Sequence, residues 1–403
     1  MKKRRYPYPI PHSVKQAVYH AVRLTEKGVR RVAGGEARTD PATLRQIRNF
    51  VLPQFQVSLG CTVHATPIVE ALHQTVPDAR IVGVMSGLAL EVFRFHAGLD
   101  RIVTVPNPSG NLLSSSRAIR RVIDDFHGEP YCVVLTDGDE NVRASVALAA
   151  MLSGRGVRGG VTVAPLLVHL PVWRDVSESL IAGNLRLVKL LGHEPAGNVE
   201  PRVCFSAADL DHARALLHGC EEHPVAVLIT RTSGGLPTRW PDERFVAVAE
   251  HLSRRGFRIV LTGTRADAGE LETLAKRMGS AAASVAGQTT IPQLAALCAV
   301  ADIAVALDTG GMHVARAQGL PLAIIAPAWQ NSVDWMPLGK PWARILKGPW
   351  MEPPPPPGYA IQEVSVEEVI AAADELLQIY PPSSGAREAR IGRSLAEVAC
   401  HSL

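Results

Sequence analysis

The chain has 403 residues, 47% hydrophobic and 20% charged, so it is long enough for two globular domains and is neither disordered nor fibrous. Its six cysteines include no Cys-x-x-Cys pair, which excludes a disulfide scaffold, argues against a zinc site and favours a reducing cytoplasm. Aromatic residues make up 5%, and no Walker loop or Gly-x-Gly-x-x-Gly motif occurs. The strongest sequence signals for an NTPase, a dehydrogenase or a nucleic-acid groove are therefore missing.

The basic residues gather at the N-terminus. Residues 1 to 31 hold nine Lys and Arg against one Glu, a net charge of +8, while the whole chain has +4 and the remainder therefore −4. Apolar residues at helical spacing from Val14 to Val22 predict a basic amphipathic helix, which either lies on an anionic membrane or packs against its own domain. Residues 40 to 52 predict a second short helix, capped by Asp40 with Pro41 at its first position. Residues 1 to 52 are thus expected to form a basic helical extension.

Targeting signals are weak. No apolar run reaches the roughly 20 residues that a membrane-spanning helix needs. Residues 6 to 33 lack the continuous apolar core of a secretory signal. We expect a cytoplasmic protein, soluble or peripheral to the inner face of the inner membrane.

Residues 53 to 200 alternate between strand-like and helix-like segments. A strand is predicted over 54 to 59, followed by a turn at Gly60 and a helix that reaches Val76. Further strands are predicted at 80 to 84, 102 to 105 and 131 to 136. This alternation indicates a parallel sheet wrapped by helices, closed by a helix over 177 to 192. An interdomain linker is expected within 194 to 224.

Residues 222 to 352 repeat the rhythm. Strands are predicted at 226 to 230, 258 to 263, 303 to 307 and 322 to 326, with helices at 242 to 255, 266 to 278, 292 to 299 and 312 to 318. Thr290 and Gln293 form a capping box. Residues 353 to 403 then comprise a Pro-rich spacer, a helix capped by Ser365, and a tail that is either weakly structured or a short helix.

One strand of the second half ends in a turn suited to an anion. After Leu307 the chain runs Asp308-Thr309-Gly310-Gly311-Met312-His313 into a helix-compatible segment. The first N–H groups of a helix have no internal partner and the macrodipole adds positive charge, so a phosphate is favoured there. The alternative is an ordinary turn in which Asp308 is a cap and His313 packs into the first turn.

The pattern Asp308-Thr309-Gly310-x-x-His313 resembles the signature of glycosyltransferase family 9, the ADP-heptose:lipopolysaccharide heptosyltransferases. Flanking elements follow in the family's order, at 239 to 241, 286 to 289 and 337 to 339. Residues 60 to 67 resemble the family's opening. Two positions depart from the pattern: Cys61 replaces the Asp after Gly60, and Thr238 replaces the Lys two residues before the Trp-Pro pair.

The resemblance implies a GT-B fold, with two Rossmann-like domains whose parallel sheets face a central cleft. It implies inverting, metal-independent transfer of a sugar, a heptose in this family, from a nucleotide-diphosphate donor such as ADP-heptose to a glycan or lipopolysaccharide-like acceptor. No cofactor and no nucleic acid is expected. The alternative is a catalytically degenerate protein that binds the nucleotide-sugar, because the Asp and the Lys are both replaced.

The donor-binding residues are expected in turns that follow strands. Arg239 would supply the cation for the diphosphate in place of the missing Lys, or it is a solvated loop arginine. Asp267 would accept hydrogen bonds from ribose hydroxyls. Trp329 and Trp335 could shape the nucleobase pocket. The full set of expected substrate-binding residues is Gly60, Ser233, Gly234, Asp267, Asp308, Thr309, Gly310, Gly311, Met312 and His313.

The general base would follow Gly60. Cys61 is a poor acceptor at neutral pH because a thiol has an ordinary pKa of about 8.5, so His64, one helical turn on, is the stronger candidate. It could instead orient the acceptor. His313 and Asp137 are the fallbacks. Asp137 and Asp139 could also hold a divalent cation or line the acceptor site, although a helix cap at Asp139 is the simpler interpretation.

Overall fold

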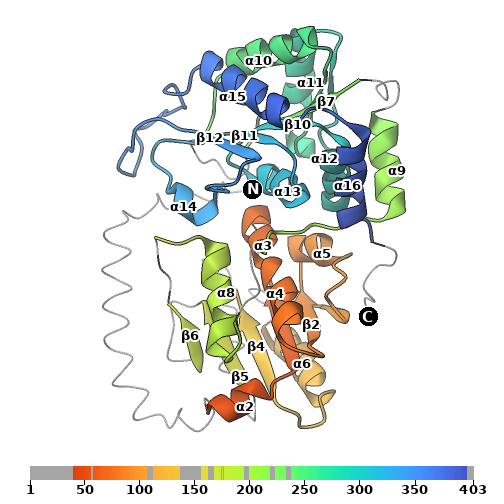
Figure 1. Ribbon diagram of the computed structural model, residues 1–403, viewed down its shortest axis with the longest axis vertical. Coiled ribbons are helices and arrows are strands. Elements are labelled where there is room, and N and C mark those ends of the chain that lie inside the picture. The colour runs from red at the N-terminus through yellow and green to blue at the C-terminus, as the bar shows by residue number, and fades with distance from the viewer. Residues whose placement is uncertain are drawn as a thin grey trace. The chain divides into compact units, whose positions relative to one another are not determined.

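The computed structural model describes residues 40–55, 58–106, 112–136, 156–161, 168–173, 175, 177–194, 199–217, 223–232 and 237–396. The chain divides between Pro201 and Arg202 into two compact units (Figure 1). Each unit contains a six-stranded sheet whose neighbouring strands all run parallel. The expectation of two parallel α/β halves is therefore confirmed.

The sheet of the N-terminal unit has the strand order β3-β2-β1-β4-β5-β6. Its strands are β1 (Asn49–Gln54), β2 (Arg80–Met85), β3 (Arg101–Thr104), β4 (Tyr131–Leu135), β5 (Val157–Val161) and β6 (Leu170–Val172). The described helices are α2 (Pro41–Arg45), α3 (Leu59–Ala65), α4 (Pro67–Thr75), α5 (Leu88–Phe93), α6 (Leu112–Asp124) and α8 (Leu180–Leu190).

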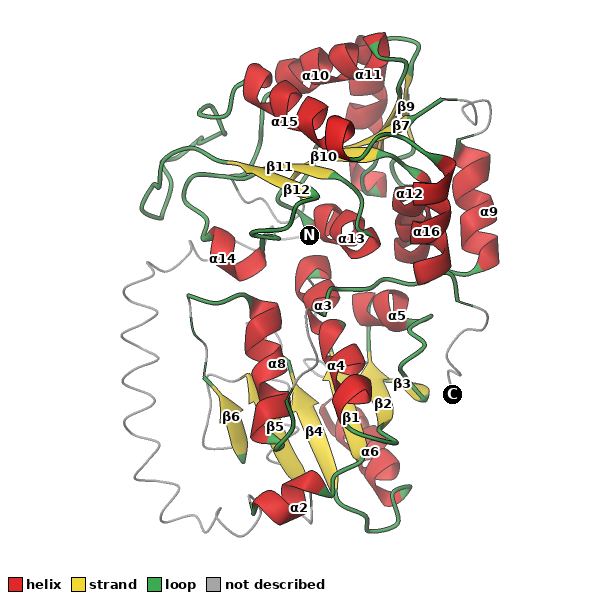
Figure 2. Cartoon of the chain, viewed as in Figure 1, coloured by secondary structure: helices red, strands yellow, loops and turns green. Residues whose placement is uncertain are grey.

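Helices cover both faces of this sheet. α3, α4 and α8 pack against one another, and α8 lies on β5 and β6 (Figure 2). On the other face, Ile119 and Val122 of α6 pack with Val133 of β4 and its neighbours in one buried cluster. Burial from both sides explains why the central strand β1 is buried along its whole length, with apolar residues from Phe50 to Pro53.

The prediction of one helix over 40 to 52 is wrong. Asp40 does cap a helix, accepting a hydrogen bond from the Thr43 N–H at 3.1 Å, but α2 ends at Arg45. Asn49 then begins β1, which pairs with β2 on one side and β4 on the other. The strand predicted over 54 to 59 is displaced accordingly, because β1 ends at Gln54 and α3 begins at Leu59. Pro53 lies within β1, although proline is uncommon in a central strand.

The C-terminal unit has the strand order β12-β11-β10-β7-β8-β9. Its strands are β7 (Val225–Ile229), β8 (Arg258–Leu261), β9 (Ala282–Ser284), β10 (Ile303–Leu307), β11 (Leu322–Ile325) and β12 (Ala343–Leu346). Its helical elements are α9 (Ala207–Leu216), α10 (Asp242–Arg254), η3 (Arg265–Asp267), α11 (Ala268–Met278), α12 (Ile291–Val300), α13 (Gly310–Gln318), α14 (Ser332–Trp335), α15 (Val366–Ile379) and α16 (Ser384–Ser394).

The helices of this unit form two groups. α10, α11 and α15 bury their apolar sides against one face of the sheet, in a cluster that includes Trp240, Phe245 and Leu376. α9, α12, α13 and α16 form the second group, in which α12 packs against each of the other three. The four predicted strands correspond to β7, β8, β10 and β11, whereas β9 and β12 were not predicted.

The helix caps predicted in this unit are confirmed. Capping boxes form at Thr290 with Gln293 and at Ser365 with Glu368, as predicted. The segment expected to hold only a linker contains α9, which begins with a further capping box at Ser206. The undecided tail contains α16.

Within the part of the chain that the structure describes, no helix is long and apolar enough to cross a membrane. The basic segment of residues 1 to 31 lies outside the described residues.

Candidate functional site

The turn after β10 opens directly onto the start of α13. β10 is fully buried between β7 and β11, and Thr309 is the N-cap residue. The first backbone bond of the helix runs from the His313 N–H to the Thr309 carbonyl at 3.3 Å, and the Thr309 side chain makes no capping bond. The N–H groups of Gly310, Gly311 and Met312 therefore precede the first helical hydrogen bond. Asp308 to Gly311 are partly exposed, so an anion can reach these groups.

Gly311 lets the helix start lie close to the neighbouring strand. A Cβ atom at this position would lie 3.1 Å from Cγ2 of Ile229, the last residue of β7. That distance is tighter than an ordinary carbon contact, so glycine suits this approach. The start of α13 is thus fixed against the carboxyl ends of two adjacent parallel strands, where open α/β sheets bind ligands.

Asp308 and His313 turn inward at this helix start. Their side chains are each 5% exposed, and His313 Nε2 lies 3.7 Å from Asp308 Oδ1. Burial raises the pKa of Asp308 to about 7, against the opposing effects of a hydrogen bond from Gln330 and the charge of Lys347. Burial, assisted by the charge of Arg316, lowers the pKa of His313 to about 3. Near neutral pH the imidazole is uncharged, so the two side chains do not form an ion pair.

Lys347 approaches the same region from β12. Its ammonium donates hydrogen bonds to the Gln330 carbonyl oxygen and to the Ser332 hydroxyl, the latter at 3.4 Å. It also lies 5.1 Å from the centre of the Trp350 ring. Burial lowers the pKa of Lys347, and the nearby Asp308 carboxylate opposes that shift. Lys347 is not among the site residues predicted from the sequence. Its signal was the short strand-compatible stretch Ala343-Arg344-Ile345-Leu346 that precedes it.

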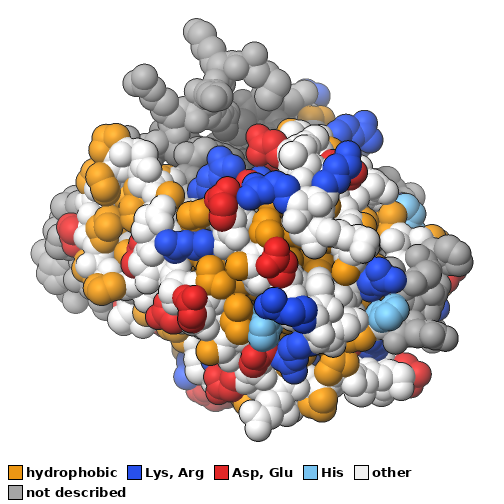
Figure 3. All heavy atoms as spheres, turned by 90° about the horizontal axis from the view of Figure 1, so that it is seen from above, with side chains coloured by type: hydrophobic (Ala, Val, Ile, Leu, Met, Phe, Trp, Pro, Cys, Tyr) orange, Lys and Arg blue, Asp and Glu red, His pale blue; other side chains and the backbone are white. Residues whose placement is uncertain are grey.

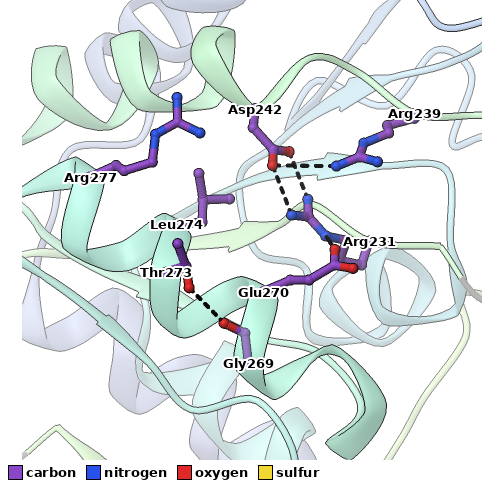
Figure 4. A pocket seen from close by; sticks show the side chains of 8 residues that line it. All are labelled: Arg231, Arg239, Asp242, Gly269, Glu270, Thr273, Leu274 and Arg277. Atoms are coloured by element: carbon purple, nitrogen blue, oxygen red, sulfur yellow. Dashed lines mark hydrogen bonds and ion pairs between the residues drawn. The ribbon is translucent and has the colours of Figure 1, made fainter.

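Arg239, the predicted diphosphate cation, lies in the segment between β7 and α10. It helps to line a pocket of about 350 Å³ between α10 and α11 (Figure 4). Its guanidinium is 62% exposed and lies 3.4 Å from the Asp242 carboxylate. Arg231 makes two hydrogen bonds to the same carboxylate, at 2.9 and 3.0 Å. The residues lining the pocket are Arg231, Arg239, Asp242, Gly269, Glu270, Thr273, Leu274 and Arg277.

The charges around this pocket are paired. Arg231 also lies 3.3 Å from Glu270, and Arg277 lies 3.1 Å from Glu243. Three arginines thus meet three carboxylates. On the molecular face seen in Figure 3, basic and acidic side chains are likewise interspersed rather than gathered by sign. The pocket therefore has a weaker net positive charge than its three arginines suggest.

Other predicted donor contacts have varied outcomes. Asp267 accepts hydrogen bonds from the Thr264 N–H at 2.8 Å and from the Thr264 hydroxyl at 2.6 Å, which makes it part of a capping box. Ser233 and Gly234 lie outside the described residues. The role of each in binding stays a prediction.

The two tryptophans differ in their surroundings. Trp329 is buried, and its Nε1–H donates to the Pro237 carbonyl at 3.3 Å. The Trp335 ring lies 6.4 Å from the imidazole of His313, at 59° to it. Only Trp335 is therefore placed directly beside the α13 turn.

The predicted acceptor-side residues lie on α3 of the N-terminal unit. Gly60, Cys61 and His64 are all within this helix, so the predicted spacing of one helical turn between Cys61 and His64 is confirmed. Cys61 is partly exposed. His64 is 1% exposed, and its carbonyl accepts a hydrogen bond from the Asn184 amide at 3.4 Å.

The alternative metal site cannot be placed, because Asp137 and Asp139 lie outside the described residues. Elsewhere in the described ranges, no group of three or more His, Cys, Asp or Glu side chains is arranged to hold a metal ion.

The family model and the known relative that match this chain both describe heptosyltransferases. The model of glycosyltransferase family 9 (heptosyltransferase) matches residues 171–326, which include the α13 turn. Lipopolysaccharide heptosyltransferase 3 of Escherichia coli is 27% identical over 336 residues, which is 79% of this chain and 96% of that protein.

Two solved structures share the fold. A glycosyl transferase family 9 protein from Veillonella parvula DSM 2008 has a TM-score of 0.69 at 18% identity, over 83% of this chain and 98% of that one. The E. coli heptosyltransferase WaaC with ADP has a TM-score of 0.60 at 16% identity, over 81% of this chain and 99% of that one.

The two parallel-sheet α/β units have the GT-B fold of these solved structures. The family match over residues 171–326 and the E. coli relative show that the chain is similar to the heptosyltransferases of glycosyltransferase family 9, and they support glycosyltransferase activity.

Proposed function

We propose that this glycosyltransferase moves a heptose from ADP-heptose to a glycan or lipopolysaccharide-like acceptor, with inversion at the anomeric carbon and without a divalent metal. The observation that carries the proposal is the accessible start of α13, where three N–H groups precede the first helical bond beside the end of β7. Two similar proteins support the choice of donor and acceptor. One is named a lipopolysaccharide heptosyltransferase, and the other was solved with ADP.

The chemistry required of the site is charge stabilisation. When the acceptor hydroxyl attacks the anomeric carbon, the bond to the donor's diphosphate breaks and negative charge grows on the leaving oxygen. Preorganised N–H groups from Gly310 to Met312 and the helix dipole favour that charge. The raised pKa of Asp308 keeps part of its carboxyl population neutral near pH 7, which reduces repulsion of the diphosphate.

A second part of the reaction is removal of the acceptor proton. An inverting transferase needs a general base as the new bond forms. We assign that role to His64, with Cys61 on the same helix in the position where the family pattern has Asp. His313 is a weaker candidate, because its pKa of about 3 makes it a poor proton acceptor.

The competing proposal of a degenerate binding protein is not favoured. The departures at Cys61 and Thr238 leave the α13 turn intact, since Asp308, Thr309, Gly310 and His313 are all present. We further propose a cytoplasmic location, with residues 1 to 31 able to contact an anionic membrane surface through their net charge of +8.

The decisive experiment is a thermal-shift screen of nucleotide-sugars and free nucleotides, followed by mass spectrometry of products formed on heptose-containing and lipid A-containing acceptors. The proposal expects ADP-heptose to give the largest shift and a product heavier by one heptose residue. Stabilisation by a UDP-sugar alone, with transfer from that donor, would contradict the assignment of the donor.

A further inference from the structure

Three neighbouring strands of the C-terminal sheet end beside one another. β10, β11 and β12 are consecutive and parallel, so their carboxyl ends lie at the same sheet edge (Figure 2). Asp308 follows β10, Gln330 lies in the segment after β11, and Lys347 is the first residue after β12. This topology places a basic side chain at the edge that also holds the start of α13.

The ammonium of Lys347 is held at this edge. Its hydrogen bonds to the Gln330 carbonyl and the Ser332 hydroxyl use two of its three donors. The Trp350 ring contacts the same group. Lys347 is therefore positioned before a ligand arrives and keeps a donor for it, which reduces the entropy lost on binding.

The neighbouring Asp308 carboxyl group is only partly satisfied. Asp308 Oδ2 is buried, and among the described residues it has no hydrogen-bond partner. A buried carboxylate oxygen in this state is costly unless a ligand or a proton satisfies it. The Asp308 and Lys347 charges also influence one another. The edge thus combines an accessible helix start, a positioned ammonium and an unsatisfied polar oxygen.

Three arginines elsewhere in this unit contact carboxylates. Arg231 and Arg239 both meet Asp242, and Arg277 meets Glu243. The position two residues before Trp240 holds Thr238, which is buried, neutral and hydrogen-bonded to the Thr232 hydroxyl at 3.0 Å. The Thr238 position itself therefore supplies no cation to a bound diphosphate.

We propose that Lys347 contacts the diphosphate of the donor from the β12 side, supplying the positive charge that Thr238 cannot supply. The inference rests on the proposed function, because it assumes that a nucleoside diphosphate occupies the α13 turn. Backbone N–H groups of α13 then bind the diphosphate on one side and the Lys347 ammonium on the other. As the glycosidic bond to the donor breaks, the electron pair passes to the diphosphate oxygen, and both sets of donors stabilise it.

Calorimetry with three variants tests the proposal. Lys347→Ala removes the charge, Lys347→Arg keeps it, and Lys276→Ala removes an exposed α11 lysine as a matched control. Each is titrated with the nucleoside diphosphate among ADP, UDP and GDP that binds the wild-type protein best, and with the corresponding nucleoside.

Removal of one charge-assisted contact should weaken diphosphate binding by about tenfold or more in Lys347→Ala. Binding of the nucleoside should change less than twofold, Lys347→Arg should recover most of the affinity, and Lys276→Ala should resemble the wild type. If Lys347→Ala lost affinity for the nucleoside and the diphosphate equally, Lys347 would only support the loop around Gln330, and the proposal would be wrong. An unchanged affinity for the diphosphate would also overturn it.

The outcomes separate this inference from the proposed function. If UDP or GDP replaces ADP as the best ligand, the ADP-heptose donor is wrong while the Lys347 comparison still decides the present inference. If the wild-type protein binds none of the three, both proposals fail.

Discussion

Asp308 and His313 lie 3.7 Å apart at the start of α13, with both side chains 5% exposed, and burial drives each of them toward its neutral form. The pair therefore adds no fixed charge of either sign beneath the proposed diphosphate site at mildly acidic pH. As the pH rises past about 7, Asp308 ionises and a buried negative charge appears there. Stability and anion binding should both respond to that change.

We expect Asp308→Asn to stabilise the protein at pH 8 and to have little effect at pH 4. Between pH 4 and 7 the unfolded chain releases the Asp308 proton while the folded protein keeps it, so wild-type stability falls as pH rises and levels off above pH 7. The difference should reach on the order of 2 to 4 kcal/mol, at about 1.4 kcal/mol per pKa unit. Urea unfolding at pH 4, 5, 6, 7 and 8 measures it.

The opposite pH dependence from His313 cancels in this comparison. Because the pKa of His313 is lowered in the folded protein, the unfolded chain binds this proton below about pH 6.5 while the folded protein does not. This effect lowers stability equally in the wild type and in Asp308→Asn. A stability difference that does not vary with pH would show that Asp308 has an ordinary pKa.

Gly310→Val should abolish tight binding of ADP. Its side chain would stand at the first position of α13, where the proposed diphosphate approaches the backbone N–H groups. We expect the dissociation constant measured by calorimetry to rise at least tenfold, about 1.4 kcal/mol.

Gly385→Val is the matched control for this variant. Gly385 is the second residue of α16, and a Cβ atom there would meet nothing within 4 Å. Unchanged ADP binding in Gly310→Val, with a folded protein, would place the diphosphate elsewhere.

Arg387→Ala should destabilise the C-terminal unit strongly. Arg387 of α16 donates to both carboxylate oxygens of the buried Asp302, at 2.9 and 2.6 Å, so its removal takes away a two-point contact and leaves the Val225 N–H and the charge of Arg390 to interact with that carboxylate. We expect a loss of about 3 kcal/mol in denaturant unfolding.

Arg344→Ala provides the comparison. Arg344 makes a similar two-point contact with Glu375, at 3.0 and 2.8 Å, but the Glu375 side chain is 54% exposed. Its loss should be about 1 kcal/mol or less, because water solvates the remaining carboxylate. If both variants lost the same free energy of unfolding, burial of the remaining carboxylate would not explain the cost of removing its arginine.

Transfer should persist in EDTA. In the proposed mechanism, the α13 N–H groups and a side-chain cation take the place of a divalent metal at the leaving group. Initial rates with and without EDTA, and with Mn²⁺ added back, measure this directly. Full loss of turnover that Mn²⁺ restores would contradict the proposal and revive Asp137 and Asp139 as ligands.

The features that were predicted correctly depend on neighbouring residues in the sequence. Capping at Asp40, Thr290 and Ser365 and the turn at Asp308 are set by side chains within about four residues, so a sequence pattern contains the whole signal.

The features that were missed depend on tertiary neighbours. β9 and β12 contain three and four residues and become strands because β8 and β11 lie beside them. Lys347 was missed for the same reason, since its proximity to Asp308 follows from the strand order. Asp242 contacts both Arg231 and Arg239, and its contact with Arg231, 11 residues away, likewise requires the fold.

The last prediction concerns the general base on α3. The helix places Cys61 and His64 one turn apart, with Cys61 partly exposed and His64 1% exposed. An imidazole with an ordinary pKa of about 6.5 is mostly neutral at pH 7 and can accept a proton, whereas a thiol with an ordinary pKa of about 8.5 is mostly protonated. We therefore expect His64→Ala to lower kcat at least a hundredfold, within the range typical of a lost general base. Cys61→Ala should retain most activity.

Because His64 is buried, its replacement could also disturb α3, so the variants need a measurement that loss of structure would not mimic. His64→Gln keeps much of the side-chain volume and hydrogen-bonding capacity but cannot accept the proton, and it should bind ADP like the wild type while losing turnover. If the imidazole accepts the proton, the wild-type rate should fall at low pH as His64 becomes protonated. The residual activity of His64→Gln should not show this fall at low pH. Full activity in either His64 variant would show that His64 is not the general base. A large gain in Cys61→Asp would instead make the residue after Gly60 the natural place for the base, because an ionised carboxylate there would accept the proton that the thiol cannot.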